Sequence, residues 1–369
     1  MGVLKLSVDA RQAASEPARM PPESVISDGA AGNAPAAPAA GEARAQHPVG
    51  RFVARRLAQG LVTLVVVSIV IFLLTSAIPG SPATAILGRN ANPQAIALIN
   101  HRLGFNKPLP ARYVDWLGNA LGGNLGNSAV AIAEGSPSAP VWPIIRSPLA
   151  DSATLALVTV ILLIPLSLLL GVWSGLRAGR WQDHTISTIT LILISMPEFV
   201  IGALLIAILF VATGLLPPVS LLSPGVFPLL HPNLLVMPVL TLLAVSVAWT
   251  IRLVRVGTIE VLQTDYVQMA RLHGIRERKV LRRYVLRNAL APSVQIFALS
   301  IQYLFGGVII TETVFNYPGI GTQLVQATTS HDNTEVQAIA LILAAVYICI
   351  NIVADLLVIL LVPKLRTAQ

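Results

Sequence analysis

Six apolar runs, separated by polar and proline-rich stretches, most constrain what this chain can fold into. Each run approaches or exceeds the roughly 18 residues that indicate a membrane span. Only 11% of the 369 residues are charged, whereas a soluble domain carries about 25%, so charge cannot cover a globular surface. The sequence predicts an all-α polytopic membrane protein with six transmembrane helices, at residues 57–78, 152–173, 185–213, 234–252, 293–311 and 337–362.

The chain divides into a tail and a membrane domain. Residues 1–50 are rich in Ala, Pro, Gly, Ser and Glu and show no apolar periodicity, which is typical of a disordered tail. Residues 51–369 form the predicted membrane domain. Within it, a long polar segment at 79–151 separates the first two spans.

Lysine and arginine gather in alternate connections between the runs. Arg177 and Arg180 join the second and third runs, and a longer basic stretch joins the fourth and fifth. The third-to-fourth and fifth-to-sixth connections contain no Lys or Arg. Because short basic loops stay in the cytoplasm, we expect both termini to be cytoplasmic and the segment 79–151 to lie outside.

Catalytic signatures are missing from the sequence. No lysine follows a glycine, so there is no Walker A loop to cradle phosphates. The six histidines are scattered, no GxSxG elbow occurs, and Cys349 is the only cysteine. We therefore predict no catalytic residues, no metal site and no directly bound cofactor.

Three acidic residues fall within or at the ends of the predicted spans. Glu198, Glu312 and Asp355 are candidates for lining a polar pathway, because lipid penalises ionisable side chains. The alternative is a hydrogen bond between helices or, for Glu312, an interfacial position. Pro197 is expected to kink the third span, and the sequence GVWSG at 171–175 has the small-xxx-small spacing of close helix packing.

The connection between the fourth and fifth spans is unusually basic, since residues 265–292 carry seven of the chain's 25 Lys and Arg. Gly274 divides it, because glycine is a poor helix former that tolerates the left-handed conformation. Asp265 with Gln268 resembles a capping box that starts the first arm. Helical periodicity gives each arm an apolar stripe: Leu262, Tyr266, Met269, Ala270 and His273 in the first, and Leu281, Tyr284, Val285 and Ala289 in the second, opposite Arg276, Lys279, Arg283 and Arg287. We predict a helix–Gly–helix element whose arms each offer one face to a partner.

Three other interpretations of this element stay open. A basic amphipathic helix can lie on anionic lipid, and a charged loop can serve only to fix topology. Nucleic-acid binding is disfavoured, because no further domain or aromatic platform accompanies the charge.

The same stretch resembles the cytoplasmic EAA signature of ABC importer permeases, most closely that of the dipeptide/oligopeptide branch. In that branch the pattern runs D-Y-[VI]-x-x-A-R-x-x-G, followed by a basic helix and then R-N-A-x-x-P. The matching positions here are Asp265, Tyr266, Val267, Ala270, Arg271, Gly274, Arg287, Asn288, Ala289 and Pro292. Gln268 stands in place of the Glu of the general signature, and Leu286-Arg287 in place of its closing Leu-Pro.

Further motifs after residue 51 are similar to the same branch and follow in its order. RRLAQGLVTLVVVSIVIFLLTSAIPGSPA resembles its first span, with Ser81 in place of an Asp. LGFNKPLPARYVDWLGNALGGNLGNS resembles its external segment, ETVFNYPGIGTQLVQA its E-T-[VI]-F-x-x-P-G-[IL]-G motif, and NIVADLLVILLVPKLR its last span and tail.

The resemblance implies a type I ABC importer permease in a bacterial inner membrane. Such a subunit pairs with a second, homologous permease, with two cytoplasmic ATPase subunits that use ATP and Mg²⁺, and with an extracytoplasmic solute-binding protein. It implies that residues 257–292 are a coupling segment seated in an ATPase groove. The residues expected to couple are Asp265, Tyr266, Ala270, Arg271, Leu272, His273, Gly274, Arg283, Arg287 and Asn288.

The substrate implied by this branch is a dipeptide or oligopeptide, and glutathione, a nickel complex or another small solute are the alternatives. A different class of function is a secondary transporter that acts without an ATPase. Inverted repeats with helices broken at matching places would favour it, and the sequence shows no such pairing. An intramembrane enzyme is disfavoured by the missing catalytic signatures.

Overall fold

A computed structural model describes residues 48–77 and 92–361, apart from 103, 105, 223 and 224. Within these ranges the chain is helical, and strand geometry is confined to an isolated bridge between Asn127 and Pro140. Its elements are α1 (Pro48–Ser76), α3 (Pro93–Arg102), α4 (Leu109–Leu121), α5 (Ala129–Ala133), α6 (Val141–Leu176), α7 (Trp181–Ser195), α8 (Glu198–Ile206), the π-helix η1 (Ala207–Ala212), the 3-10 turn η2 (Pro228–Leu230), α9 (Pro232–Leu262), α10 (Asp265–Leu272), α11 (Glu277–Lys279), the π-helix η3 (Val280–Leu286), α12 (Arg287–Phe315), α13 (Ile320–Thr329) and α14 (Asn333–Leu361).

Within the described residues, five helices are long and apolar enough to cross a membrane, and a bent pair makes a sixth candidate span. The predicted all-α membrane fold is thereby confirmed. The predicted tail lies outside the described residues except for residues 48–50, which already belong to α1.

Several span helices are longer than the apolar runs in the sequence. Helix α6 begins at Val141 rather than at residue 152, so the predicted external segment 79–151 also contains its first turns, as well as α3, α4 and α5. Helix α9 continues to Leu262 rather than ending at residue 252. Hydropathy marks only the part of a helix that lies in hydrocarbon, so it misses turns that continue into water.

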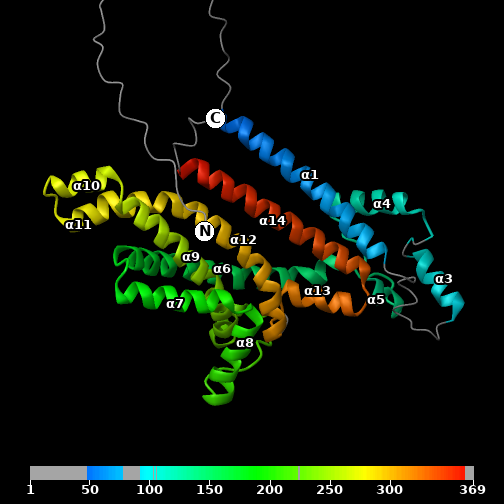
Figure 1. The fold of residues 1–369 in the computed structure, drawn as a ribbon. Coiled ribbons are helices and arrows are strands. Elements are labelled where there is room, and N and C mark those ends of the chain that lie inside the picture. Colours follow the sequence, from blue (N-terminus) through cyan, green and yellow to red (C-terminus); the bar gives the residue numbers. More distant parts are fainter. Residues whose placement is uncertain (1–47, 78–91, 103, 105, 223–224, 362–369) are drawn as a thin grey trace, which may run out of the picture. The chain divides into compact units, whose positions relative to one another are not determined.

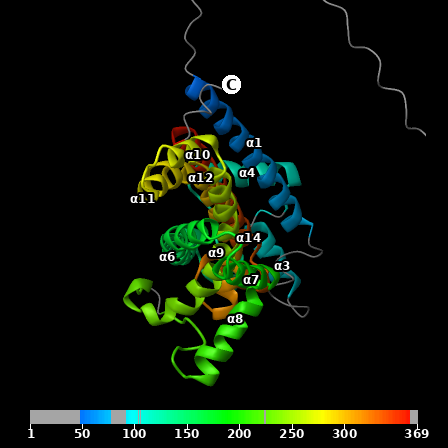
Figure 2. The same ribbon diagram turned by 60° about the vertical axis from the view of Figure 1, so that its left-hand side comes forward.

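The third span is broken, and the prediction of one span over 185–213 is wrong in this respect. Helices α7 and α8 meet at an angle of 103°, and α8 turns away from α7 in both ribbon views (Figures 1 and 2). Met196 is extended at φ −96° and ψ 133°, because the ring of Pro197 disfavours the helical conformation of the residue before it. The expected kink at Pro197 is confirmed.

Helix α9 is the centre of the membrane domain. In its most apolar window 72% of the residues are buried, against 11% for α1, and α6, α7, α8 and α12 all pack on it. Its contact with α6 depends on glycine, because a Cβ atom at Gly171 would come within 2.7 Å of the Val254 side chain. One at Gly175 would come equally close to Thr258. The predicted small-xxx-small packing is confirmed.

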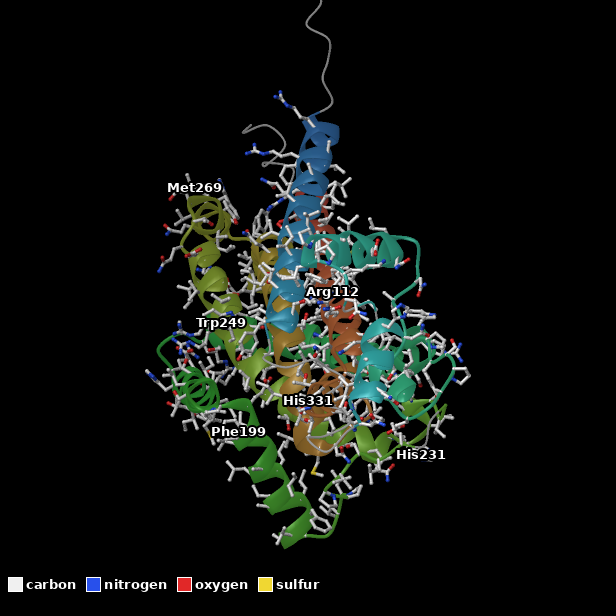
Figure 3. All side chains as sticks on the ribbon, turned by 90° about the vertical axis from the view of Figure 1, so that its right-hand side faces the viewer. Arg112, Phe199, His231, Trp249, Met269 and His331 are labelled. Carbon is white, nitrogen blue, oxygen red and sulfur yellow. The ribbon has the colours of Figure 1, made fainter. Side chains whose placement is uncertain are left out.

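Helices α1 and α14 lie side by side (Figure 1). The α10–α11 region lies at one end of α9 and α12, and α13 at the other (Figure 1). Figure 3 shows the same separation, with Met269 far from His231 and His331.

Candidate functional site

The basic connection between α9 and α12 folds into two arms. Helix α10 begins directly after Thr264, whose backbone is extended and whose hydroxyl donates to the carbonyl of Val261 at 2.6 Å. Asp265 is thus the first helical residue, and Gln268 donates to the carbonyl of Gln263 at 3.3 Å. The predicted capping box on Asp265 is therefore wrong: Thr264 takes the extended conformation that a helix start needs, one residue earlier.

Gly274 ends the first arm and reverses the chain. Its φ is +69°, its amide donates to the carbonyl of Arg271 at 2.9 Å, and the amide of Ile275 donates to the carbonyl of Ala270 at 3.2 Å. This pair of hydrogen bonds around a left-handed residue is a Schellman motif. The predicted left-handed glycine is confirmed.

The two arms hold each other through a small apolar core. Val267 and Ala270 of α10 are buried against Val280 and Val285 of η3, and Leu262, Ile275, Leu281 and Tyr284 pack around them. The predicted second stripe is the inner face of its arm, as far as the described side chains extend. The arms therefore form one compact unit rather than two separate helices.

The predicted first stripe is split between two faces, which corrects it. Leu262 and Ala270 face inward, whereas Tyr266, Met269 and His273 are exposed. With Leu272, which is 81% exposed, Tyr266 and Met269 form an apolar surface that we call the outer face of α10. Periodicity could not separate the faces, because this eight-residue helix carries apolar residues on both sides.

The charged coupling candidates with described side chains are exposed. Arg271 pairs with Glu277 at 2.8 Å, which links the first arm to the start of the second. Asp265 and Arg283 are exposed. Arg287 and Asn288 belong to the first turn of α12, and their side chains lie outside the described part of the structure. Among the described coupling candidates, Ala270 alone is buried, and it belongs to the core between the arms.

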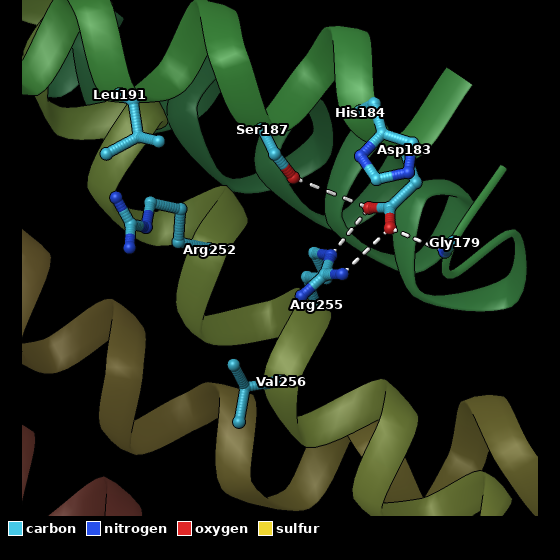
Figure 4. Close-up of a pocket in the computed structure, with 8 residues that line it drawn as sticks. All are labelled: Gly179, Asp183, His184, Ser187, Leu191, Arg252, Arg255 and Val256. Carbon is cyan, nitrogen blue, oxygen red and sulfur yellow. Dashed lines mark hydrogen bonds and ion pairs between the residues drawn. The ribbon is translucent and has the colours of Figure 1, made fainter. Parts of the chain in front are cut away.

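A buried ion pair between α7 and α9 was not anticipated from the sequence (Figure 4). Asp183 is 2% exposed and accepts two hydrogen bonds from Arg255 of α9, at 2.6 and 2.8 Å. Ser174 of α6 and the amide of Gly179 donate to the same carboxylate at 2.6 and 2.9 Å. This network ties α6, α7 and α9 together. Its only signal in the sequence is one acidic and one basic residue, each within three positions of a predicted span end.

Glu198 is the first residue of α8, directly after the break in the third span. It is 8% exposed, and its Oε1 is buried without a hydrogen-bond partner among the described residues. The carboxylate lies against Gly307 of α12, where any Cβ atom would overlap it. Buried polar groups are nearly always hydrogen-bonded, so Glu198 is unusual in this fold. Whether it lines a pathway stays a prediction.

Glu312 lies in a closed polar cluster near the end of α12. It is fully buried and accepts hydrogen bonds from the Ser152 hydroxyl of α6 and, at 2.7 Å, from the amide of Gly321. The amide of Ile320 donates to Ser152 at 2.7 Å. A carboxylate suits the first turn of α13 because it accepts from otherwise unpaired amides. These contacts match the hydrogen bond between helices that was the alternative for Glu312.

Tyr317 completes this cluster from the turn between α12 and α13. Its ring is fully buried, and its hydroxyl donates to the carbonyl of Asp151 at 2.9 Å. Burial raises the pKa of this phenol above its ordinary value. The hydroxyl therefore remains a hydrogen-bond donor. The motif ETVFNYPGIG here connects α12 to α13 and fixes both to α6.

Asp355 of α14 pairs with Arg56 of α1 at 2.9 Å, and both side chains are partly exposed. Glu198, Glu312 and Asp355 thus lie on different helices and have separate surroundings. The structure does not bring them together as one site. In the described part of the chain, no three His, Cys, Asp or Glu side chains gather closely enough to hold a metal ion.

Comparison with known proteins gives two family matches that together cover nearly all of the described chain. Residues 49–141 match the N-terminal model of binding-protein-dependent transport system membrane components, and residues 167–367 match the model of the inner membrane component itself. A probable peptide ABC transporter permease of Sinorhizobium fredii is 34% identical over 86% of this chain and 100% of its own length.

Glutathione transport system permeases are also similar. Those of Escherichia coli and Pectobacterium atrosepticum are each 33% identical over 85% of this chain, and over 98% and 97% of their own lengths. All these relatives carry the names of transport permeases and not of enzymes, and the resemblance to the dipeptide/oligopeptide branch is confirmed. The chain belongs to the family of binding-protein-dependent transport system inner membrane components and is an ABC transporter permease.

Proposed function

We propose that this permease forms half of an importer's translocation pathway and that α10 couples it to ATP hydrolysis in a partner subunit. The observation that carries this proposal is the outer face of α10. Tyr266, Met269 and Leu272 are 41%, 57% and 81% exposed, on a helix whose opposite face is locked to the second arm. An apolar helix face of this kind fits a groove on a protein partner.

The contacts between the two arms make them move together. The Schellman turn at Gly274 and the ion pair between Arg271 and Glu277 connect them, and their shared core prevents them from sliding past each other. The first arm continues from α9 and the second continues into α12. An ATPase that displaces α10 therefore displaces the cytoplasmic ends of both helices, which is the kind of rigid-body motion that alternates access to a pathway.

The proposal places α10 and both termini in the cytoplasm. The support is the charge asymmetry between connections. The elements α11 and η3 carry Arg278, Lys279, Arg282 and Arg283. The connections that follow α8 and α12 contain no Lys or Arg. Single cysteines at Asn127 and Arg278, in a Cys349→Ala background, test this orientation. An impermeant thiol reagent on intact cells should label position 127 and spare position 278, and equal labelling would refute it.

The remaining subunits follow from the family. We propose a second, homologous permease, two cytoplasmic ATPases that bind ATP and Mg²⁺, and an extracytoplasmic solute-binding protein. Reconstituting this set in vesicles should give uptake that depends on ATP. Uptake by the chain without any ATPase would favour a secondary transporter instead.

The decisive variant changes the outer face. Leu272→Glu adds a charge at a position that is 81% exposed, so it should leave the fold intact and weaken binding of the ATPase subunits. Leu121→Glu on α4 is the matched control, because that leucine is 78% exposed and lies far from the arms in sequence. Binding measured in detergent micelles removes the bilayer from the comparison. Equal ATPase binding by both variants would reject the coupling role and favour a helix that lies on lipid.

For the substrate we propose di- or oligopeptides, with glutathione as the second candidate because related permeases carry that name. Glutathione is itself a small peptide, so both candidates share an ammonium, carboxylates and amide groups. The test is ATP-dependent uptake of a labelled dipeptide in the presence of unlabelled tripeptide or glutathione, with the cognate binding protein. Uptake of glutathione without any peptide uptake would overturn the first choice.

A further inference from the structure

A cavity of about 340 Å³ opens between α7 and α9 beside the buried ion pair (Figure 4). Its size falls within the range of small-molecule sites, which starts at about 300 Å³. The polar lining comes from His184 and Ser187 of α7 and from Arg252 and Arg255 of α9. Leu191 and Val256 supply an apolar side.

The charges around this cavity do not cancel. Asp183 is the single carboxylate among the described lining residues, and Arg255 already neutralises it through two hydrogen bonds. Arg252 lies three positions before Arg255, is exposed, and makes no ion pair or hydrogen bond with any described residue. In Figure 4 its side chain lies beside Leu191 and not on Asp183. Among the described residues, the cavity therefore presents one guanidinium without a partner, a group that binds phosphate through paired hydrogen bonds.

Residues near the cavity are of the kinds expected at the edge of a bilayer. Arg252 is the last residue of the apolar run predicted from the sequence, although α9 continues to Leu262. Trp249 lies one turn before Arg252 and is 49% exposed. Trp181 is the first residue of α7 and is 72% exposed. Tryptophan is enriched where membrane meets water. Leu191, which lines the cavity, and Trp249, one turn before Arg252, are apolar side chains that are 50% and 49% exposed.

We propose that this cavity binds the phosphate of an anionic phospholipid from the cytoplasmic leaflet. Arg252 holds the phosphate, His184 and Ser187 contact the headgroup, and an acyl chain packs on Leu191 and Trp249. The exposed apolar side chains of Leu191 and Trp249 are the reason to choose a lipid over free phosphate. Basic pockets between transmembrane helices on the cytoplasmic side are a recurrent setting for anionic lipids.

The location gives the bound lipid a role. Arg255, which lines the cavity, belongs to the network that joins α6, α7 and α9, and α9 leads directly into α10. A lipid that fills the cavity stabilises the packing of α7 on α9 by adding contacts to both helices. The inference rests on the cytoplasmic placement proposed above, which the labelling of position 278 tests separately.

The experiment uses the whole transporter, purified with its partner subunits and reconstituted in nanodiscs of phosphatidylcholine with or without phosphatidylglycerol. Native mass spectrometry after transfer to detergent counts the lipids that stay bound. The test variant is Arg252→Gln. The matched control is Arg180→Gln, because Arg180 is an exposed arginine at the start of α7 that does not line the cavity.

The unaltered protein and Arg180→Gln should retain phosphatidylglycerol in preference to phosphatidylcholine, and Arg252→Gln should retain about fivefold less, the factor expected for one arginine near an anionic surface. Equal retention by the two variants would overturn the proposal. So would displacement of the signal by inorganic phosphate alone, which would indicate a phosphate site, or by the transported peptide, which would place the cavity on the substrate's path. A charge-retaining Arg252→Lys variant should restore most of the binding.

Discussion

Replacing Gly274 with valine tests whether the left-handed turn between the two arms is needed for coupling. The residue sits at φ +69°, and a Cβ atom added there meets nothing within 4 Å. The added Cβ atom therefore meets no neighbour, and the expected cost is backbone strain. A β-branched residue in this region is a genuine outlier, and the strain is about 1–3 kcal/mol.

The strain should appear at the ATPase and not in the membrane domain. If the arms must hold this geometry to dock, about 1–3 kcal/mol lowers the population competent for docking by roughly 5- to 150-fold. Substrate-stimulated ATP hydrolysis and uptake should fall together, and a higher concentration of ATPase subunits should partly restore both. Gly274→Asn should be milder, because asparagine tolerates the left-handed conformation.

Gly214→Val provides the control for strain as such. Gly214 has φ +63° and likewise nothing within 4 Å, but it lies after η1 and apart from α10 in sequence. That variant should bear a similar local strain and keep its affinity for the ATPase. Normal ATP-driven uptake by a well-expressed Gly274→Val complex, or an equal loss from Gly214→Val, would refute the reasoning.

Three further substitutions test the membrane domain. Asp183→Asn should lower the free energy of unfolding by about 3 kcal/mol. This is the low end of the range for breaking a buried ion pair, and we choose it because Arg255 is 28% exposed. An unchanged thermal midpoint of unfolding would contradict this prediction. Gly171→Ala should cost about 1–3 kcal/mol by forcing α6 away from α9, whereas Gly118→Ala on α4, with open space around it, should not destabilise the protein in the same thermal assay. Glu198→Gln should change the uptake kinetics of charged peptides relative to neutral ones if the carboxylate faces the pathway, and identical kinetics for both would make it a structural residue.

Much of the membrane domain could be predicted because its causes are local. Hydropathy located the spans, the ring of Pro197 predicted the kink in the third, and the spacing of Gly171 and Gly175 indicated where α6 approaches another helix. Gly274 could be identified as the turn, because a glycine between two amphipathic stretches typically ends the first helix. Each of these features depends on the chemistry of neighbouring residues in sequence.

Other features depend on residues far apart in the chain, and the sequence alone could not supply them. The pair between Asp183 and Arg255 joins positions 72 residues apart, so neither residue has a local signature. For Glu312 the sequence left open a pathway, a hydrogen bond between helices or an interfacial position, because its contacts with Ser152 and Gly321 form only when α6, α12 and α13 meet. The two faces of α10 were not separable either, because only the fold shows which apolar residues meet the second arm.

The direct continuation of η3 into α12 has a mechanical consequence. Helix α12 has 29 residues, which at 1.5 Å per residue makes a rod of about 44 Å. A tilt of about 10° at one end of such a rod moves the other end by roughly 8 Å. At that far end, Glu312 clamps the rod to α6 and to the start of α13. If α10 is displaced as proposed above, this clamp would make α13 move together with the far end of α12.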